Sequence, residues 1–415
     1  MIDIKDLRAD PDKYRNAAKA KQFDPKLIDD LLKIDGKRIE LIKKVEDLRA
    51  KRNQVAKKKG DKGREEGREI KEVLVKLEPE LKTVEIEYKN ALNKLPYPPA
   101  EDVKIGKDES ENEVIKKWGK PKKFSFKPKD HLELGEALDI IDVKRASKVS
   151  GPRFGYLKGD AVKLEFALIN FAFEFLIKEG FIPIVPPVLI KKDMMAAMGY
   201  LEHGGEDEMY VLEKDNLVLV GTSEQTIGTM HAGEILKGDE LPKRYVGFST
   251  CFRREAGSYG KDTKGIFRVH QFDKVEMFSF TKQEESDKEH EYLLSLEEKI
   301  FQLLEIPYQV LKMCSGDLGL PFSRKYDLEA WFPVQGRYRE VTSTSNANDF
   351  QSRRLNTRYQ DKEEIKYIHM LNGTALSIGR PIIAIMENYQ QKDGSIKIPK
   401  VLQKWFGEKT IKSQS

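Results

Sequence analysis

The segments S-T-C-F-R-R-E-A-G-S at residues 249–258 and R-V-H-Q-F-D-K-V-E at residues 268–276 decide the fold of this chain. They hold the groups that an ATP-activating site needs. Arginine forks bind phosphate oxygens, an aromatic face covers adenine, and carboxylates bind a cation or an amine. The tetrapeptide F-R-R-E alone could equally be a salt-bridged surface strand, so the prediction of a nucleotide site depends on the whole stretch.

Length and composition set the broad class. The chain has 415 residues, which is room for a large mixed domain and an accessory one. Its first residues, M-I-D-I-K-D-L-R, carry charges where a secretion signal needs an apolar run, and no membrane span is evident. Only Cys251 and Cys314 occur, and the six histidines lack metal-ligand spacing. We therefore expect a cytoplasmic enzyme with no membrane contact and no zinc.

A long helical hairpin is predicted at about residues 27–94. Apolar residues repeat at a spacing of three and four along both predicted helices, which is typical of a coiled coil. They are Leu31, Ile34, Leu41, Val45, Leu48 and Val55 in the first helix, and Ile70, Leu74, Leu77, Leu81, Val84, Tyr88 and Leu92 in the second. Residues 57–68, with three glycines, are predicted to form the turn, and Pro96, Pro98 and Pro99 to end the second helix.

Basic charge is concentrated on this hairpin. Residues 37–64 contain 12 Lys and Arg against 4 Asp and Glu, a local balance of +8, whereas the whole chain carries +5. One interpretation is a solvated charged hairpin, the usual meaning of helices rich in Lys and Glu. The other is a surface that contacts a phosphate backbone near the tip.

The rest of the chain predicts an α+β domain. Strand-like runs at 217–220, 245–251 and 273–280 are mixed with helices at 161–179 and 284–304, without the strict alternation of a doubly wound fold. We therefore predict two domains, residues 1–105 with the hairpin and residues 106–415 with the nucleotide site.

The two opening segments resemble motif 2 of the class II aminoacyl-tRNA synthetases, and their wording is close to that of the seryl-tRNA synthetases. The resemblance covers nearly the whole chain. It includes G-F at 180–181 with the prolines at 183, 186 and 187 (motif 1), T-S-E at 222–224, Y-R-E-V-T-S-T-S-N at 338–346, N-G-T at 372–374 and G-R at 379–380 (motif 3).

This resemblance implies a class II catalytic domain, an antiparallel six-stranded sheet flanked by helices, together with an N-terminal antiparallel coiled-coil arm. It implies a homodimer and an enzyme that joins L-serine to tRNA(Ser) through a seryl-adenylate, with ATP as substrate and Mg²⁺ as cofactor. In this family the same enzyme also serves tRNA(Sec) where that tRNA exists.

The resemblance also implies roles for residues. The serine site would be Thr222, Ser223, Glu224, Arg253, Glu276, Asn372 and Thr374. The ATP site would be Arg253, Arg254, Glu255, Val269, Phe272, Glu340, Val341, Thr342, Ser343 and Arg380, with Glu340 and Ser343 holding Mg²⁺. Arg253, Arg268, Glu276 and Arg380 would be the catalytic residues. The arm would contact tRNA phosphates through Lys51, Arg52, Lys57, Lys58, Lys59, Lys62 and Arg64.

Two other functions fit parts of this pattern. A synthetase-like ligase that loads an amino acid onto a carrier protein keeps the adenylation site, but usually loses or remodels the arm. A non-catalytic RNA-binding or scaffold protein of the same fold would have lost arginines or glutamates of the site, and this chain has kept them.

Overall fold

A computed structural model describes residues 1–57, 61–256 and 264–412 of the chain. The chain divides into two compact units, Met1–Pro98 and Pro99–Ser415. The domain boundary predicted at 105/106 lies close to this division and stays a prediction. In the described ranges, no helix has both the length and the apolar composition that crossing a membrane requires.

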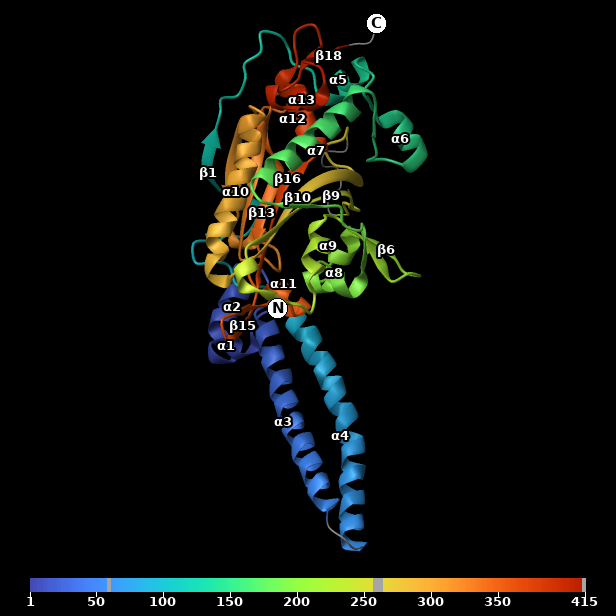
Figure 1. The fold of residues 1–415 in the computed structure, drawn as a ribbon, viewed down its shortest axis with the longest axis vertical. Coiled ribbons are helices and arrows are strands. Elements are labelled where there is room, and N and C mark those ends of the chain that lie inside the picture. Colours follow the sequence, from blue (N-terminus) through green and yellow to red (C-terminus); the bar gives the residue numbers. More distant parts are fainter. Residues whose placement is uncertain (58–60, 257–263, 413–415) are drawn as a thin grey trace. The chain divides into compact units, whose positions relative to one another are not determined.

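The first unit consists of helices. They are α1 (Ile4–Ala9), α2 (Pro11–Ala20), α3 (Lys26–Val55) and α4 (Asp61–Asn93). Helices α3 and α4 lie side by side and form the predicted hairpin (Figure 1). Its seam is apolar as the spacing predicts, because Val45, Val55, Ile70 and Leu74 are buried together and Leu48 packs against them, while the polar positions between them are mostly exposed.

The predicted turn at 57–68 is wrong over most of its length, because α4 begins at Asp61. The glycines at 63 and 67 lie inside the helix, among Lys, Arg and Glu residues that favour helix. A Cβ on Gly67 would make an ordinary contact of 3.8 Å with the Val55 side chain, so the helix packing there does not require glycine. Pro79 also lies inside α4, where it removes one backbone N–H from the helix.

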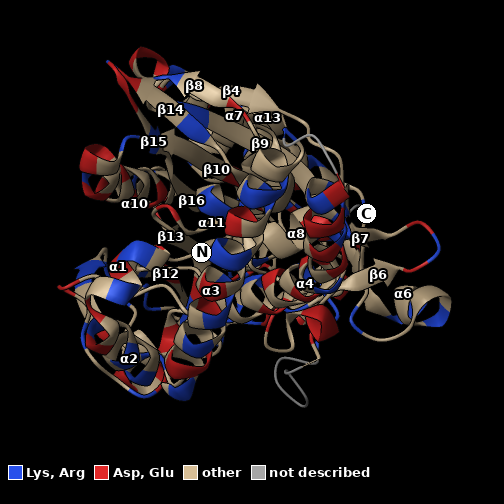
Figure 2. Ribbon diagram, turned by 90° about the horizontal axis from the view of Figure 1, so that it is seen from below, with Lys and Arg blue, Asp and Glu red and all other residues tan. Residues whose placement is uncertain are grey.

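Charges of both signs lie along α3 and α4 (Figure 2). Between described residues, three ion pairs cross the hairpin: Lys37 with Glu80 at 2.9 Å, Arg49 with Glu78 at 2.9 Å, and Lys51 with Glu66 at 3.4 Å. The acidic residues of the second helix therefore offset part of the basic excess of the first.

The second unit is built on an eight-stranded sheet. In spatial order its strands are β1 (Glu113–Trp118), β11 (Tyr308–Lys312), β12 (Arg324–Phe332), β13 (Arg337–Asn346), β16 (His369–Ser377), β10 (Gln271–Thr281), β9 (Lys243–Phe252) and β4 (Ile182–Ile184). All neighbouring pairs are antiparallel except β4 with β9. This arrangement confirms the predicted antiparallel sheet, although the sheet has eight strands where the resemblance implies six.

Helices pack on the sheet and enclose the main core (Figure 1). The long ones are α7 (Asp160–Lys178), α10 (Ser286–Leu303) and α12 (Gly379–Tyr389). The shorter ones are α5 (His131–Ala137), α6 (Val143–Ser150), α8 (Lys192–Met198), α9 (Glu224–Thr229), α11 (Phe350–Leu355) and α13 (Gln403–Phe406). Helix α7 buries Leu164, Leu168 and Phe171, as the apolar spacing of this segment predicts.

Small sheets complete the unit. They are β5 (Leu189–Lys191) with β7 (Leu217–Leu219) and β6 (Tyr210–Leu212), β8 (Ile235–Lys237) with β14 (Arg358–Asp361) and β15 (Glu364–Tyr367), β2 (Ile141–Asp142) with β3 (Tyr156–Leu157), and β17 (Ile396–Lys397) with β18 (Thr410–Ile411).

A buried carboxylate joins α1 to α3. Asp35 is 2% exposed and accepts two hydrogen bonds from Arg8, at 2.7 and 3.0 Å, and two from Arg38, at 3.1 and 3.3 Å. We expect Asp35→Ala to destabilise this helical unit by about 2 kcal/mol, because two arginines lose a buried partner while Arg8 stays partly solvated.

Hydrogen exchange of α1 and α3 in the full chain measures this effect. The control is Asp12→Ala, which removes an exposed partner of Arg15 and should leave exchange nearly unchanged. Equal exchange in the two variants would contradict the role of Asp35.

Candidate active site

A cavity of about 590 Å³ lies in the second unit and gathers the predicted site residues. Its lining includes every residue predicted for serine, ATP and catalysis except Ser223 and Arg254. The predicted residues that line it are Thr222, Glu224, Arg253, Glu255, Arg268, Val269, Phe272, Glu276, Glu340, Val341, Thr342, Ser343, Asn372, Thr374 and Arg380. Segments up to 158 positions apart in sequence therefore meet in one space.

Strand register brings these residues together. Side chains alternate along a strand, so Phe272, Lys274 and Glu276 of β10 face the same side of the sheet. Glu276 pairs with Thr374 of β16, next to a register shift at Val275. Asn372 of β16 pairs in turn with Ser345 of β13.

One end of the cavity is acidic and buried. Glu276 is 1% exposed, and one of its oxygens lies 2.5 Å from Nζ of Lys274, whose Nζ also donates to Thr222 at 3.2 Å. Glu224, at the start of α9, accepts a hydrogen bond of 2.7 Å from the Tyr200 hydroxyl. Two carboxylates and hydroxyl groups in a small space suit a ligand that carries both an ammonium and a hydroxyl.

Burial dominates the protonation of Glu276. It raises the pKa of this carboxyl to about 7, a change that Lys274 opposes and the nearby charge of Glu224 assists. The carboxyl therefore changes its charge close to neutral pH, where a bound ammonium would favour the ionised form.

The other end of the cavity holds Glu340 of β13, Arg380 of α12 and Lys325 of β12. Arg380 lies 3.2 Å from a Glu340 carboxylate oxygen. Desolvation would raise the pKa of Glu340, but Arg380 and Lys325 outweigh it and hold this pKa at about 2. Asp327, opposite Ser343 in the sheet, is almost fully buried, and burial raises its pKa to about 7.

Oxygen ligands at this end fit Mg²⁺. The Glu340 side chain keeps 46% of its surface exposed and stays ionised, and the Ser343 hydroxyl belongs to the same strand. Carboxylate and hydroxyl oxygens are hard ligands of the kind that Mg²⁺ prefers. Among the described residues, no group of three or more His, Cys, Asp and Glu is arranged to hold a metal ion, and the expected absence of zinc stays a prediction.

Between the two ends, arginines lie against aromatic rings. Arg253 is fixed by a 3.1 Å hydrogen bond to the Gly221 carbonyl, and its guanidinium lies 5.3 Å from the centre of the Phe272 ring. Arg268 forms an ion pair with Glu255. These groups offer positive charge beside an apolar surface, as a nucleotide requires.

Some predicted residues lie elsewhere. The Ser223 side chain is fully buried and faces Gly247 instead of the cavity. Arg254 is exposed outside the cavity lining. Thr342 lines the cavity, but its hydroxyl donates to buried Glu297 of α10 at 2.7 Å. Gly257 and Ser258 of the opening motif, and Lys58 and Lys59 of the arm, lie outside the described residues.

Several residues that line the cavity have no role predicted from the sequence. Tyr200, Glu208, Phe267 and Lys325 are among them. Tyr200 belongs to no local motif, and only the fold brings it to Glu224. Lys325 and Asp327 lie two positions apart on β12 and therefore face the same side of the sheet. Two charged residues on a mostly buried strand were the sequence signal that could have pointed to Lys325.

Comparison with known proteins identifies the family. Residues 1–99 match the seryl-tRNA synthetase N-terminal domain, and residues 210–389 match the class II tRNA synthetase core domain of the G, H, P, S and T enzymes. The serine–tRNA ligase of Dictyoglomus turgidum is 46% identical, over 99% of each chain. The chain belongs to the seryl-tRNA synthetases.

Solved structures of this family agree with the fold. A seryl-tRNA synthetase from Pyrococcus horikoshii, complexed with ATP, is 41% identical with a TM-score of 0.94, and each chain is fully covered. A cytoplasmic serine–tRNA ligase from Naegleria fowleri in complex with AMP is 32% identical with a TM-score of 0.89, over 98% of this chain and 96% of that one. The predicted class II catalytic fold with an N-terminal helical arm is therefore confirmed.

The pKa of Glu276 predicts that activation of serine depends on pH. A protonated Glu276 has lost its negative charge and is a weaker hydrogen-bond acceptor, so binding of a ligand with an ammonium and a hydroxyl should favour the ionised form. We expect kcat/KM for serine in pyrophosphate exchange to rise about tenfold from pH 6 to pH 8, since ionisation near pH 7 increases over that range.

Glu276→Gln is the matched control. Its exchange should be weak and should lack this rise, because an amide does not ionise. A flat profile in the unaltered protein, or the same rise in the variant, would assign the pH dependence to another group.

Proposed function

We propose that the protein is a serine–tRNA ligase. Serine and ATP form seryl-adenylate and pyrophosphate, and the seryl group then passes to the 3′-terminal adenosine of tRNA(Ser), releasing AMP. The observation that carries this proposal is the juxtaposition of Glu276, Thr374 and Glu224 with Arg253, Arg268 and Arg380 in one cavity. A small hydroxylated amino acid and a nucleotide then share that space.

In the first step, an oxygen of the serine carboxylate attacks the α-phosphorus while the bond to pyrophosphate breaks. Arg253 binds the carboxylate and the α-phosphate, and Arg268 and Arg380 bind the leaving pyrophosphate. No protein nucleophile is required, because positioning and charge stabilisation are sufficient for this kind of transfer. Glu255, Val269 and Phe272 bind the adenine.

Glu340 and Ser343 would hold the Mg²⁺ ion. When bound there, the ion neutralises phosphate charge that the arginines alone leave uncompensated. In this proposal Val341 and Thr342 contribute to the ATP site through their backbone, since the Thr342 hydroxyl is engaged by Glu297.

Serine is selected because an amino acid without a hydroxyl would leave a polar group of the pocket without a partner. Glu276 accepts the serine hydroxyl, and Thr222 and Glu224 bind the ammonium. Alanine would leave Glu276 without that partner, and buried polar groups without partners are costly. Asn372 and Thr374 close the pocket against the extra methyl of threonine.

The arm is proposed to bind tRNA. Exposed Arg52, Lys57 and Lys62 make no ion pair within the described part of the chain, whereas Lys51 and Arg64 have acidic partners. Free cations near the tip are available for RNA phosphates, and two helices suit recognition of RNA shape. Lys58 and Lys59 belong to the same proposal by sequence alone.

We also propose that the protein is a homodimer and acts in the cytoplasm. Phe166 and Ile177 of α7, Ile182 of β4 and Val185 are large apolar residues that are between 47% and 76% exposed, and a partner subunit would cover such residues. Service to tRNA(Sec) remains a prediction from the family.

The ligase that loads a carrier protein is not favoured. Such an enzyme usually loses or remodels the arm, whereas this chain has a full hairpin and an N-terminal domain of the seryl-tRNA synthetase type.

Transfer of labelled serine to total tRNA, with ATP and Mg²⁺, tests the proposed function. We expect tRNA charging that excess alanine or threonine does not inhibit. Activation of serine without transfer to any tRNA would restore the carrier ligase.

The Arg253→Ala variant should lose at least about a thousandfold in the rate of serine-dependent pyrophosphate exchange, because the substitution removes charge stabilisation in the transition state.

The arm is tested separately. Replacing Arg52, Lys57 and Lys62 together by alanine should raise KM for tRNA about tenfold or more and reduce its salt dependence, because fewer counterions are released on binding. Pyrophosphate exchange without tRNA should be unchanged.

The matched control replaces Lys71, Lys82 and Lys89 of α4, which removes the same charge away from the tip. An equal loss in both triple variants would indicate attraction by net charge instead of contacts at the tip.

A further inference from the structure

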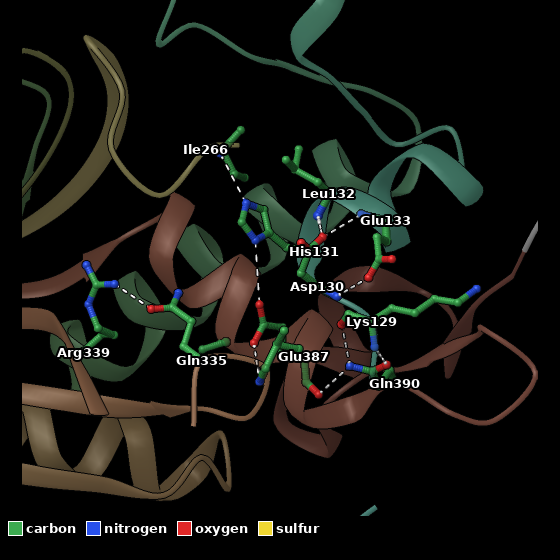
Figure 3. Close-up of polar contacts among 12 residues, drawn as sticks. Lys129, Asp130, His131, Leu132, Glu133, Ile266, Gln335, Arg339, Glu387 and Gln390 are labelled. Carbon is green, nitrogen blue, oxygen red and sulfur yellow. Dashed lines mark hydrogen bonds and ion pairs between the residues drawn. The ribbon is translucent and has the colours of Figure 1, made fainter. Parts of the chain in front are cut away.

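We infer that His131 is a positioning residue for ATP: it fixes the 265–268 segment, from which Phe267 and Arg268 enter the cavity. His131 does not line the cavity itself. The inference deepens the proposed function and rests on it, because it concerns the same nucleotide site. Figure 3 shows His131 between Ile266 and Glu387.

The backbone of His131 is anchored first. Asp130 and Glu133 form a capping box at the start of α5, with hydrogen bonds of 2.8 and 3.0 Å. Lys129 and Gln390 exchange two hydrogen bonds, of 2.8 and 2.9 Å, which tie this helix start to the chain after α12 (Figure 3). The imidazole therefore extends from a fixed point.

The imidazole meets two elements. Its Nε2 accepts a hydrogen bond of 3.4 Å from the Ile266 backbone N–H. A neutral imidazole that accepts at Nε2 carries its proton on Nδ1, and Nδ1 lies 3.7 Å from a carboxylate oxygen of Glu387 on α12. His131 is 7% exposed and Glu387 is 1% exposed. If the contact between them were lost, little water could reach either side chain to take the place of its partner.

The 265–268 segment has little room to adopt another position. Gly265 has φ of +77°, and a Cβ there would lie 2.0 Å from His131 Nε2. The Ile266 carbonyl oxygen lies 3.2 Å from the place of a Cβ on Gly379, where α12 begins. The peptide is therefore enclosed between α5 and the start of α12.

The next two residues reach the nucleotide site. The Phe267 ring lies 4.1 Å from the Arg339 guanidinium and 4.9 Å from that of Arg380, and it contacts Phe332 edge to face. Arg268 pairs with Glu255. A shift of the segment would thus displace two arginines of the proposed pyrophosphate site, Arg268 directly and Arg380 through the Phe267 ring.

The serine end should be insensitive to this shift. Glu276 and Thr374 lie within the strand ladder of β10 and β16, which does not depend on His131. Loss of the His131 contact should therefore weaken ATP binding selectively, whereas a general loss of packing would affect both substrates.

Three variants test the inference. His131→Leu fills the space but cannot accept the Ile266 N–H. His131→Gln can place an oxygen near the Nε2 position, and His131→Asn places its amide near the Nδ1 position. We expect KM for ATP to rise about tenfold in the Leu and Asn variants, with KM for serine within about twofold and substantial rescue in the Gln variant.

Calorimetric binding of a non-hydrolysable ATP analogue is measured on the same full-length proteins. This binding does not depend on which amino acid is activated, so a failure of the proposed function leaves the test of His131 intact. Should the Leu variant not fold, the Gln and Asn pair decides. Equal analogue affinity in the Gln and Asn variants, or equal losses for ATP and serine, would overturn the inference.

Discussion

The antiparallel pairing of β10 with β16 is the constraint on which the site depends. It sets Glu276 opposite Thr374, and through β13 it places Ser345 beside Asn372. Because side chains alternate along a strand, a slip of one residue would turn Glu276 into the other face of the sheet. The register shift beside Val275 is part of that alignment, since it changes which residues of β16 face the cavity.

Charges within the sheet are tolerated because they have partners. Lys274 lies beside Glu276, Lys325 beside Asp327, and Arg380 beside Glu340. Replacing such pairs by apolar residues often costs a protein nothing, so stability alone does not explain them. They lie where the ammonium, carboxylate and phosphate groups of bound substrates would displace water. Perturbed pKa values are typical of such sites.

Local patterns in the sequence predict the hairpin and the main strands, because each pattern lies within one element. The family resemblance, carried by short motifs, implies most of the cavity residues. Local patterns do not predict a structure that is determined by helix propensity or by contacts between residues far apart in the sequence. The turn at 57–68 was read from glycines that α4 accommodates. Tyr200 meets Glu224 across 24 positions, and His131 meets Ile266 across 135, and neither contact leaves a periodic signal. The resemblance places Ser223 in the serine site, whereas its side chain is buried beside Gly247, and its role there stays a prediction.

The two ends of the cavity are held by different forces. At the serine end, Glu276, Thr374 and Asn372 are fixed by backbone ladders that run through the sheet. At the phosphate end, Arg253 follows a strand, Arg268 belongs to an irregular segment and Arg380 begins a helix, so no ladder fixes all three. Their alignment needs side-chain contacts between elements, such as Phe267 between Arg339 and Arg380, and His131 on Ile266. Selection of the amino acid is therefore a property of the sheet, whereas nucleotide positioning is a property of the contacts around it.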